Sequence, residues 1–447
     1  MRKMVAAILC IMMMVSVLAG CGSASAPDQT DTTVTTADTA TGTSTNAATE
    51  TQKKDITITV GASQNWVKDI DRALAEAFTA KTGIKIDFQV NPDDQYKNII
   101  KTKLATNEAP DILYVNVGIA LEDYQPEKYF MNLSDMAWVS KMKDWAIKGC
   151  SVNGKLYAYN IWSVEANGLL YNTQIFEKYK LTPPNNFNEL KNVCKVLLEN
   201  GIQPIYDNAK DIWHMHWWPA QLAVEIEKDQ PGITEKLNKN EAKLSDSKAL
   251  LQGMKDYKEL YDLGYMGKNA LANEWVPGYQ AMGTGKAAMI NTYSTYQNEV
   301  FQQFPESKAD TWKMFPVTIG GCNSVALSAG GIARAVNANT KNKAEVEAYF
   351  NYLAEDENAK SFYTARTDLG EPAYKGIDVR PLSQGYTSLS TYSVNGRSTV
   401  LSNSVKYWSQ DVIAKAMQDM LIGTLTPEEV LQTIDEDRIK SFNTAGK

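Results

Sequence analysis

The chain has few of the residues from which metal sites and disulfide frameworks are built. It contains only two histidines and five cysteines in 447 residues, and no CxxC spacing occurs. Beyond residue 21 only three cysteines remain, which are Cys150, Cys194 and Cys322. They allow at most one disulfide, and the sequence leaves open whether any two of them pair. We interpret all three as buried thiols.

Motifs of nucleotide-binding and hydrolytic enzymes are also missing. The segment "GTGKAAM" (residues 283–289) has no glycine five residues before Gly285, and Ala287 stands where a phosphate-binding loop needs Ser or Thr. We interpret this segment as helical. No G-x-S-x-G elbow or other hydrolase signature lies near the histidines. We therefore expect no catalytic residue, no cofactor and no enzyme activity.

The chain lacks an excess of positive charge. Its formal net charge is −7, and without residues 1–20 it has 43 Lys and Arg against 52 Asp and Glu. This balance argues against nucleic acid or an anionic membrane face as a partner. With 44% hydrophobic and 22% charged residues the chain is globular, and its length favours two or more lobes.

The N-terminal apolar run is too short to span a membrane. It covers residues 4–17, whereas a membrane-spanning helix needs ~20 residues, so residues 1–20 are predicted to be a signal peptide. The sequence "LAGC" resembles the bacterial lipobox, which implies that Cys21 is lipidated; a plain secretory signal is the alternative. Residues 21–54, rich in Thr, Ala, Ser and Asp, are predicted to be a disordered tether to the membrane surface.

Strands and helices are predicted to alternate where the folded body begins. The segments "DITITV" (55–60), "IKIDFQV" (84–90) and "PDILYVN" (110–116) have strand patterns. Between them lie two helical segments, one ending at Gly83 and the other capped by Asn91. This alternation predicts an α/β sheet with its ligand crevice at the carboxyl ends of the strands. The residues that follow those ends are Gln64, Asn65, Trp66, Asp93, Asp94 and Asn116.

Six segments resemble, in order, the signatures of the family 1 extracellular solute-binding proteins of ABC importers. They are "EAFTAKTGIKIDFQV", "KLATNEAPDILYVN", "VEANGLLYNTQIFEKYKLTPPNNFNELKNVCKVLLENGIQPI", "GYQAMGTGKAAMINTYSTYQ", "SAGGIARAVNANTKNKAEVEAYFNYLAEDENAKSFY" and "TPEEVLQTIDEDRIKSF". One such segment would be weak evidence, but six in family order are specific. The resemblance covers residues 55–443.

The resemblance implies an α/β fold of two lobes, the type II periplasmic-binding-protein-like fold, with the ligand in the cleft between them. The first lobe would comprise residues 55–163 and 324–371, and the second would comprise residues 164–323 and 372–447. Hinge bending would close the lobes around the ligand. The segments that cross between the lobes would lie near residues 163–167, 321–325 and 370–375.

A sugar in such a cleft would need aromatic plates for its C–H faces and fixed polar groups for its hydroxyls. The chain offers 10 Trp and 22 Tyr. By the resemblance, Trp408 matches a tryptophan that stacks on sugar in maltose-binding members of the family, and Glu165 matches a cleft carboxylate. Core packing and ordinary surface exposure are the alternatives for such residues. The other candidate contacts outside the histidine stretch are Asn65, Trp66, Asp94, Asn116, Trp162, Tyr293 and Arg366.

The stretch "WHMHWWP" (213–219) gathers three tryptophans and both histidines. As a metal site it would need a third and a fourth ligand that are not histidine. By the resemblance it follows the first strand of the second lobe and faces the cleft. We predict that Trp213 and His216 contact the ligand and that Trp218 belongs to the core. Each histidine is expected to donate one hydrogen bond to ligand or backbone.

The sequence thus predicts a monomeric lipoprotein on the outer face of the bacterial cytoplasmic membrane. It would capture a carbohydrate, by expectation an oligosaccharide, and deliver it to the permease of an ABC importer. One alternative is a binding protein of the same fold for a peptide, a polyamine or a metal; an amine ligand would need several converging carboxylates. Another is a surface glycosidase, which would need two carboxylates flanking the scissile bond.

Overall fold

The computed structural model describes residues 56–329 and 331–445, and the structural statements below concern these residues. The predicted signal peptide, the predicted lipidation site Cys21 and the predicted tether lie outside them. Among the described helices, none combines the length and the apolar character that crossing a membrane requires.

A five-stranded sheet lies in the first lobe. Its strand order is β2-β1-β3-β12-β6; β1 pairs in parallel with β2 and β3, whereas β12 is antiparallel to β3 and β6. The first elements alternate as predicted, strand, helix, strand, helix, strand. The bounds are β1 (Thr57–Ser63), α1 (Asp69–Thr82), β2 (Lys85–Asn91), α2 (Asp93–Ala105), β3 (Ile112–Asn116), β6 (Ala158–Asn160) and β12 (Ile332–Val336).

The boundaries of the first two helices have local causes. Gly83 follows α1 in the left-handed conformation (φ 81°), and its N–H donates to the Thr79 carbonyl, which confirms the predicted helix end. The helix α2 begins at Asp93 with Pro92 in the N-cap position. The prediction that Asn91 caps this helix is wrong, because Asn91 is the last residue of β2 and pairs with Ser63.

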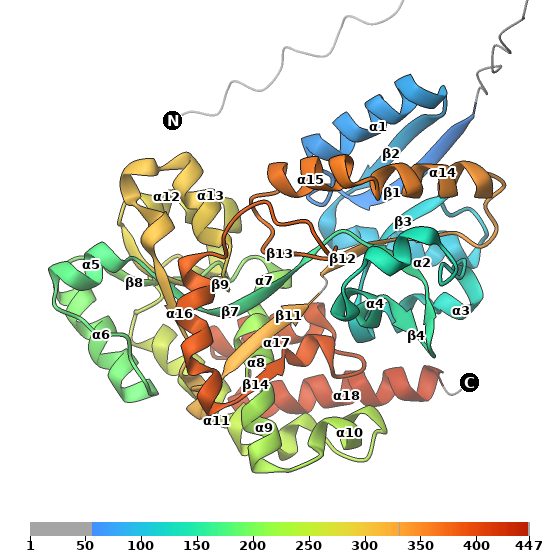
Figure 1. The fold of residues 1–447 in the computed structure, drawn as a ribbon. Coiled ribbons are helices and arrows are strands. Elements are labelled where there is room, and N and C mark those ends of the chain that lie inside the picture. Colours follow the sequence, from blue (N-terminus) through green and yellow to red (C-terminus); the bar gives the residue numbers. More distant parts are fainter. Residues whose placement is uncertain (1–55, 330, 446–447) are drawn as a thin grey trace, which may run out of the picture. The chain divides into compact units, whose positions relative to one another are not determined.

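Segments from the middle and the late part of the chain complete the first lobe. Figure 1 shows α14 and α15 beside α1 and β1, although they come from the second half of the sequence. The buried Arg334 of β12 pairs with Asp71 of α1 and donates to the Tyr114 hydroxyl (3.0 Å), so it joins three elements. The further bounds are η1 (Gly118–Tyr124), α3 (Pro126–Tyr129), α4 (Asp144–Gly149), β4 (Ser151–Val152), β5 (Lys155–Leu156), α14 (Lys343–Leu353) and α15 (Asp356–Ala365).

A second sheet, built around β7, lies in the second lobe. Its order is β14-β11-β7-β9-β8, and β10 and β13 also pair with β7. All nine residues of β7 are buried, which is typical of a central strand covered on both faces. The bounds are β7 (Ser163–Tyr171), β8 (Gln203–Tyr206), β9 (Ala287–Tyr293), β10 (Lys313–Phe315), β11 (Val325–Ala329), β13 (Glu371–Pro372) and β14 (Arg397–Thr399).

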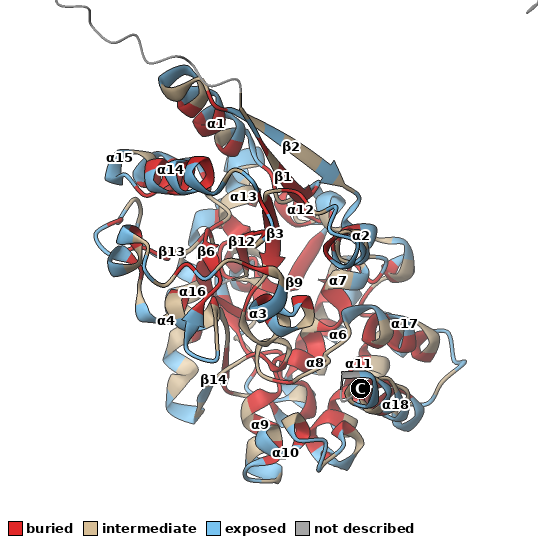
Figure 2. Cartoon of the chain, turned by 90° about the vertical axis from the view of Figure 1, so that its right-hand side faces the viewer, coloured by how far each residue is buried: buried red, intermediate tan, exposed pale blue. Residues whose placement is uncertain are grey.

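Helices cover the second sheet, and Figure 2 shows buried strands beside helices whose outer faces are exposed. The helical prediction for residues 283–289 is wrong from Ala287 onward, because β9 begins there and pairs with β7 and β8. The bounds are α5 (Thr173–Lys178), α6 (Phe187–Glu199), α7 (Ile212–Met215), α8 (Trp217–Ala220), α9 (Ala223–Asp229), α10 (Ile233–Asn238), α11 (Lys248–Asp262), α12 (Trp275–Gly283), α13 (Tyr296–Gln303), α16 (Gln384–Ser390), η9 (Leu401–Asn403), α17 (Gln410–Leu421) and α18 (Pro427–Ala445).

Two parts of the chain lie in a different lobe from the predicted one. Residues 325–329, which the prediction assigned to the first lobe, form β11 and pair with β7, with Ala329 opposite Val164. Ala373 and Tyr374 were assigned to the second lobe but lie in the core of the first. Pairing with β7 and side-chain packing decide these positions, and neither can be read from spacing along the chain. The other domain boundaries remain a prediction.

The three cysteines of the body are buried, as predicted, and they are free, which answers the question of pairing that the sequence left open. Cys150 lies in the core of the first lobe, and Cys194 and Cys322 lie in that of the second. Burial raises the pKa of the Cys150 thiol to about 12 and raises the pKa values of the other two thiols as well. These thiols are therefore packing residues.

Candidate functional site

The carboxyl ends of the parallel strands mark the candidate site. In the first lobe the ends of β1, β2 and β3 lie at one edge of the sheet. In the second lobe β9 ends beside the middle of β7, where Tyr293 pairs with Asn167 and the Ser294 N–H donates to the Ala166 carbonyl (2.8 Å). Ligands of open α/β sheets bind at such edges.

Asp93 organises the polar groups at the edge of the first sheet. The Ser63 hydroxyl and the Asn65 amide both donate to its carboxylate, so the end of β1 is tied to the start of α2. Asn65 is exposed and remains available to a ligand, as does the neighbouring exposed Asp94. Asp93 itself followed a predicted strand but was not among the predicted contacts, and the structure shows that it holds Asn65 in place.

An aromatic ring and an amide complete this edge. Trp66 is half-buried and meets Tyr96 edge to face, with ring centroids 5.4 Å apart. The Asn116 amide oxygen accepts a hydrogen bond from the Tyr124 hydroxyl (3.4 Å), and Asn116 is half-buried. Both predicted residues therefore keep part of their surface free.

Arg366 supports a ring at the crossing between the lobes. The side chain is 1% exposed, and its Nε and Nη2 donate to Asp368 at 2.7 and 2.6 Å. Its guanidinium lies 5.1 Å from the centroid of the half-buried Trp162 ring, a cation–π arrangement. Arg366 was predicted to contact the ligand directly, but it is buried and instead packs against the Trp162 ring.

Glu165 lies at the same crossing and is 3% exposed. Its carboxylate accepts four hydrogen bonds of 2.5–3.2 Å, from the hydroxyls of Ser163, Ser294 and Thr295 and from the N–H of Gly370. Burial raises the pKa of Glu165 to about 7, and the four hydrogen bonds oppose that shift. Because its donors come from three separate segments, Glu165 joins the start of β7, the end of β9 and the segment after α15.

Four half-buried rings gather at the edge of the second sheet. They come from the segment after β8, from the start of α12 and from the end of β9, and neighbouring centroids lie 5.0–6.4 Å apart. Most of these pairs meet edge to face, which leaves ring faces for other partners. We call this group the ring cluster; its members are Trp213, Trp217, Trp275 and Tyr293.

Trp275 is the member of the ring cluster that sequence reasoning missed. Its backbone N–H donates to the Asp211 carboxylate (2.5 Å), which ties the start of α12 to the segment that carries Trp213. Its indole N–H donates to the Tyr279 hydroxyl (2.8 Å), and that hydroxyl donates to Glu299. The only sequence signal was a tryptophan at the start of a helix, because 61 residues separate it from Trp213 and hide their proximity.

The histidines lie behind the ring cluster and are neutral. His214 is fully buried, and its Nε2 lies 2.9 Å from the Asn291 carbonyl. His216 is 1% exposed, and its Nδ1 accepts a hydrogen bond from the indole N–H of Trp408 (3.1 Å). Burial lowers the pKa values of both histidines to about 3. His216 was expected to donate a hydrogen bond to ligand or backbone, but its Nδ1 accepts one from a side chain instead. Its burial leaves almost no surface for the predicted direct contact with ligand.

Trp218 belongs to the core, as predicted. It is fully buried, and its indole N–H donates to Asp207 (3.1 Å), which also accepts from the Tyr257 hydroxyl (2.7 Å). Trp213, five residues earlier, keeps exposed surface. Trp213 is therefore accessible and Trp218 is in the core, as predicted.

One ion pair joins the two lobes near Trp408. Lys406 Nζ lies 2.9 Å from the Glu122 carboxylate of η1, and the two side chains are 35% and 43% exposed. Trp408, two residues along, is half-buried. This contact places the predicted Trp408 at the boundary between the lobes.

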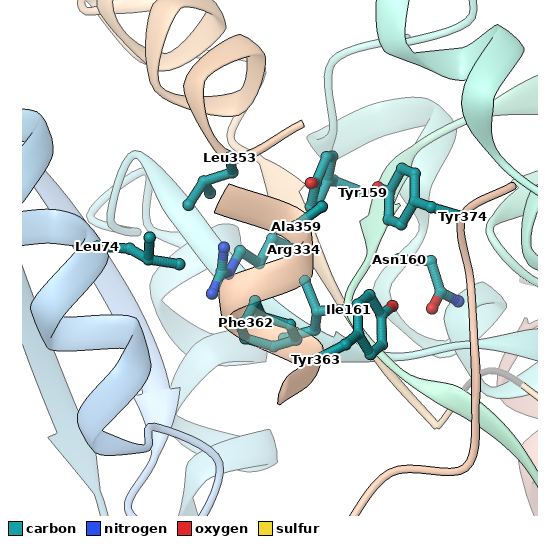
Figure 3. A pocket seen from close by; sticks show the side chains of 10 residues that line it. All are labelled: Leu74, Tyr159, Asn160, Ile161, Arg334, Leu353, Ala359, Phe362, Tyr363 and Tyr374. Atoms are coloured by element: carbon teal, nitrogen blue, oxygen red, sulfur yellow. The ribbon is translucent and has the colours of Figure 1, made fainter. Parts of the chain in front are cut away.

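Two cavities lie near these groups. The first, in Figure 3, has a volume of about 10 Å³ and lies beside α15, with Arg334, Phe362 and Tyr363 among its lining residues. That volume holds roughly one water molecule, so it is interior packing space. The second, about 180 Å³, lies between Thr295 and the segment 369–383, next to Gly370.

The structure thus brings the predicted residues together in three groups. Asn65, Trp66, Asp94 and Asn116 lie at the edge of the first sheet, and Trp162, Glu165 and Arg366 lie at the crossing. The third group, at the edge of the second sheet, contains Trp213, Tyr293, His216 and Trp408. No group of three or more metal-binding side chains occurs among the residues that the structure describes.

Residues 64–360 match the family described as bacterial extracellular solute-binding protein. The chain belongs to this family. The match confirms the family resemblance, and it covers most of both lobes. Members of this family are binding proteins, and the family description places them outside the cell.

Two curated relatives and one solved structure illustrate the likeness. The multiple sugar-binding protein of Streptococcus mutans serotype c is 22% identical over 323 residues, which are 70% of this chain and 74% of that protein. The melibiose/raffinose/stachyose-binding protein of Bacillus subtilis strain 168 is 29% identical over 152 residues, 33% of this chain and 34% of that protein. The structure of a chitin oligosaccharide binding protein superposes with a TM-score of 0.73 at 18% identity, covering 87% of this chain and 100% of that one.

These relatives confirm the predicted two-lobe α/β fold. The curated relatives are named as sugar-binding proteins, and the structural likeness speaks for the fold alone.

Proposed function

We propose that the protein captures a neutral oligosaccharide between its two lobes. The observation that carries this proposal is the ring cluster at the edge of the second sheet, whose four rings each keep exposed surface. Sugar C–H faces stack on such rings, and sugar hydroxyls bond to fixed amides and carboxylates. The edge of the first sheet offers the same combination in Asn65 and Trp66.

The charges at the crossing favour a neutral ligand over an amine. A polyamine or a cationic peptide would need carboxylates free to receive it. Glu165 already accepts four hydrogen bonds, Asp368 is paired with Arg366, and Glu299 accepts from Tyr279. The names of the two curated relatives, which bind multiple sugars and melibiose, raffinose or stachyose, support the same choice.

Delivery to an importer completes the proposal. The lobes are connected by several chain segments, a construction that permits hinge closure around the ligand, and the closed form would be the one that the permease of an ABC importer recognises. The protein would act as a monomer on the outer face of the cytoplasmic membrane, held through lipid on Cys21 and the segment 21–54. It would perform no chemistry on the sugar.

The anchor has a direct test. Cys21→Ala should move the protein from the membrane fraction to the soluble fraction, because the mature chain would then carry no acyl groups. Quantitative immunoblotting of both fractions measures the effect, with Cys150→Ala as the matched control that leaves the distribution unchanged. Persistent sedimentation of the Cys21→Ala protein with membranes would contradict the anchoring.

The ligand class is tested by calorimetry on residues 55–447 with raffinose, stachyose, chitin oligosaccharides and spermidine. We expect at least one oligosaccharide to bind and spermidine to give no heat. A ligand at 100 times its Kd also adds roughly 2.7 kcal/mol to the free energy of unfolding, so a thermal shift should accompany binding. Binding of spermidine in the absence of any sugar binding would overturn the proposal. New reducing ends after incubation with an oligosaccharide would show instead that the protein is a glycosidase.

A further inference from the structure

The geometry around Trp408 points to His216 as the residue that positions this ring for the ligand. We infer that His216, which is itself buried, acts on binding through its hydrogen bond to the Trp408 indole. The inference rests on the proposed function, because it assigns Trp408 to the sugar site. This role accounts for a buried histidine that neither a metal site nor direct ligand contact explains.

The hydrogen bond fixes the state of the histidine. An indole N–H can only donate, so His216 Nδ1 must be the acceptor and the ring proton must lie on Nε2. Nε2 is buried and has no hydrogen-bond partner among the described residues. Burial also holds the pKa of His216 near 3, so the imidazole stays neutral and remains an acceptor throughout the physiological pH range.

The backbone on the other side of the ring is strained. Tyr407 has φ 57°, a left-handed conformation that is uncommon for a residue with a bulky side chain. Such conformations persist where the surroundings fix them, and they gather at ligand sites. Here the Tyr407 ring packs edge to face on Phe442 of α18, with centroids 4.6 Å apart.

The residue before Tyr407 is held as well. The Lys406 N–H donates to the Asn238 side chain (2.7 Å), and the Lys406 carbonyl accepts from the buried Arg438 (3.2 Å). Trp408 is therefore restrained in two ways, through the backbone contacts of the residues before it and through the hydrogen bond of its own side chain to His216. Both restraints limit the orientations open to the half-buried indole.

His216 also connects two rings of the candidate site. It separates α7 from α8, and its neighbour Trp217 belongs to the ring cluster. The His216 ring lies 6.4 Å from the Trp408 ring and 6.5 Å from the Trp217 ring, centroid to centroid. A single buried side chain thus sets the spacing between Trp408 and the ring cluster.

Nuclear magnetic resonance tests the bond without any ligand. The indole N–H signal of Trp408 is assigned in protein labelled with 15N-tryptophan as the signal that disappears in Trp408→Phe. We expect His216→Leu to shift this signal, because it removes the acceptor, and His216→Asn to restore it, because the Asn oxygen takes the place of Nδ1. An unmoved signal in His216→Leu would overturn the inference.

Calorimetry with the sugar that the wild type binds tests the consequence. We expect His216→Leu to weaken affinity about five- to tenfold, the effect of one lost hydrogen bond, and His216→Asn to stay within about twofold. In a Trp408→Phe background, which lacks the indole N–H, His216→Leu should add no further loss. Additive losses would mean that His216 acts by another route and would overturn the inference.

Gln418→Leu is the matched control. Gln418 of α17 donates to the Ala209 carbonyl (2.7 Å), so it links the same two segments without touching Trp408. We expect it to lower the melting temperature while the indole signal and the affinity stay unchanged. If Trp408→Ala keeps full affinity in a protein that binds sugar, the inference fails and the proposed function stands. If the wild type binds no sugar, the proposed function fails, whereas the indole signal still reports the bond.

Discussion

At the scale of single residues, exposure distinguishes the predicted contacts that a ligand can reach from those that are buried. Trp213 and Trp66 keep free surface, whereas Arg366, Glu165 and His216 are almost fully buried. The sequence predicted all five as one class of ligand contact, because residue type and position in a loop do not reveal burial. The buried three contact rings and chain segments of the protein itself, so we propose that they act on a ligand only indirectly.

The tryptophan pair of residues 213 and 218 gives the first prediction. Trp213→Ala should weaken sugar binding by about 2 kcal/mol, or roughly thirtyfold, because it removes stacking and apolar contact. Trp218→Ala should instead lower the free energy of unfolding by about 3–5 kcal/mol through a core cavity. Calorimetry and urea unfolding of both variants measure the two effects. Equal loss of stability in both variants would place Trp213 in the core.

Glu165 gives a prediction about pH. Its folded-state pKa of about 7 lies above the ordinary 4.5, so the protonated carboxyl stabilises the fold. This contribution is present in full below about pH 4.5 and is lost as the pH rises through about 7. Between pH 5 and pH 8 the unfolding free energy of the wild type should therefore fall by roughly 2 kcal/mol relative to Glu165→Gln. If the difference in unfolding free energy between the wild type and Glu165→Gln is the same at pH 5 and pH 8, the raised pKa of Glu165 is contradicted.

At the scale of elements, pairing between strands fixed element boundaries that the local sequence pattern did not predict. Asn91 looks like a helix cap but ends β2, and Ala287 looks helical but begins β9, because in each case the neighbouring strand extends the pairing. Gly83, in contrast, ended its helix as predicted, since a left-handed glycine is a local property. The capping box at the start of α18 is local in the same sense, because Thr426 and Glu429 exchange hydrogen bonds across three residues.

The segment after α15 gives a prediction at this scale. A Cβ on Gly370 would lie 2.7 Å from the Glu165 carboxylate and 2.8 Å from the Val164 carbonyl. Gly370→Ala should therefore force the segment away from β7 and cost about 1–3 kcal/mol in urea unfolding. Gly149→Ala is the control, because its Cβ would meet only Val117 at an ordinary 3.8 Å. Equal unfolding free energies of Gly370→Ala and Gly149→Ala would show that the segment after α15 can move away from β7 without loss of stability.

At the scale of the whole molecule, the connections between the lobes are the feature that matters for function. The lobes have separate cores, and the segments around Glu165 and Gly370 join them. A saturating sugar should lower the radius of gyration of residues 55–447 in solution scattering, because closure brings the lobes together. A radius that stays constant while calorimetry shows binding would remove hinge closure from the mechanism.

The sequence by itself determined the properties that depend on composition, local pattern and order of segments. The acidic balance follows from composition, and the alternation of strands and helices and the six family segments can be recognised within short stretches of chain. Only the tertiary structure decided which residues meet. The approach of Trp275 to Trp213, of Trp408 to His216 and of Gly370 to Glu165 joins positions far apart in sequence. Strand register and core packing set these contacts, and neither can be predicted from the sequence of a single segment.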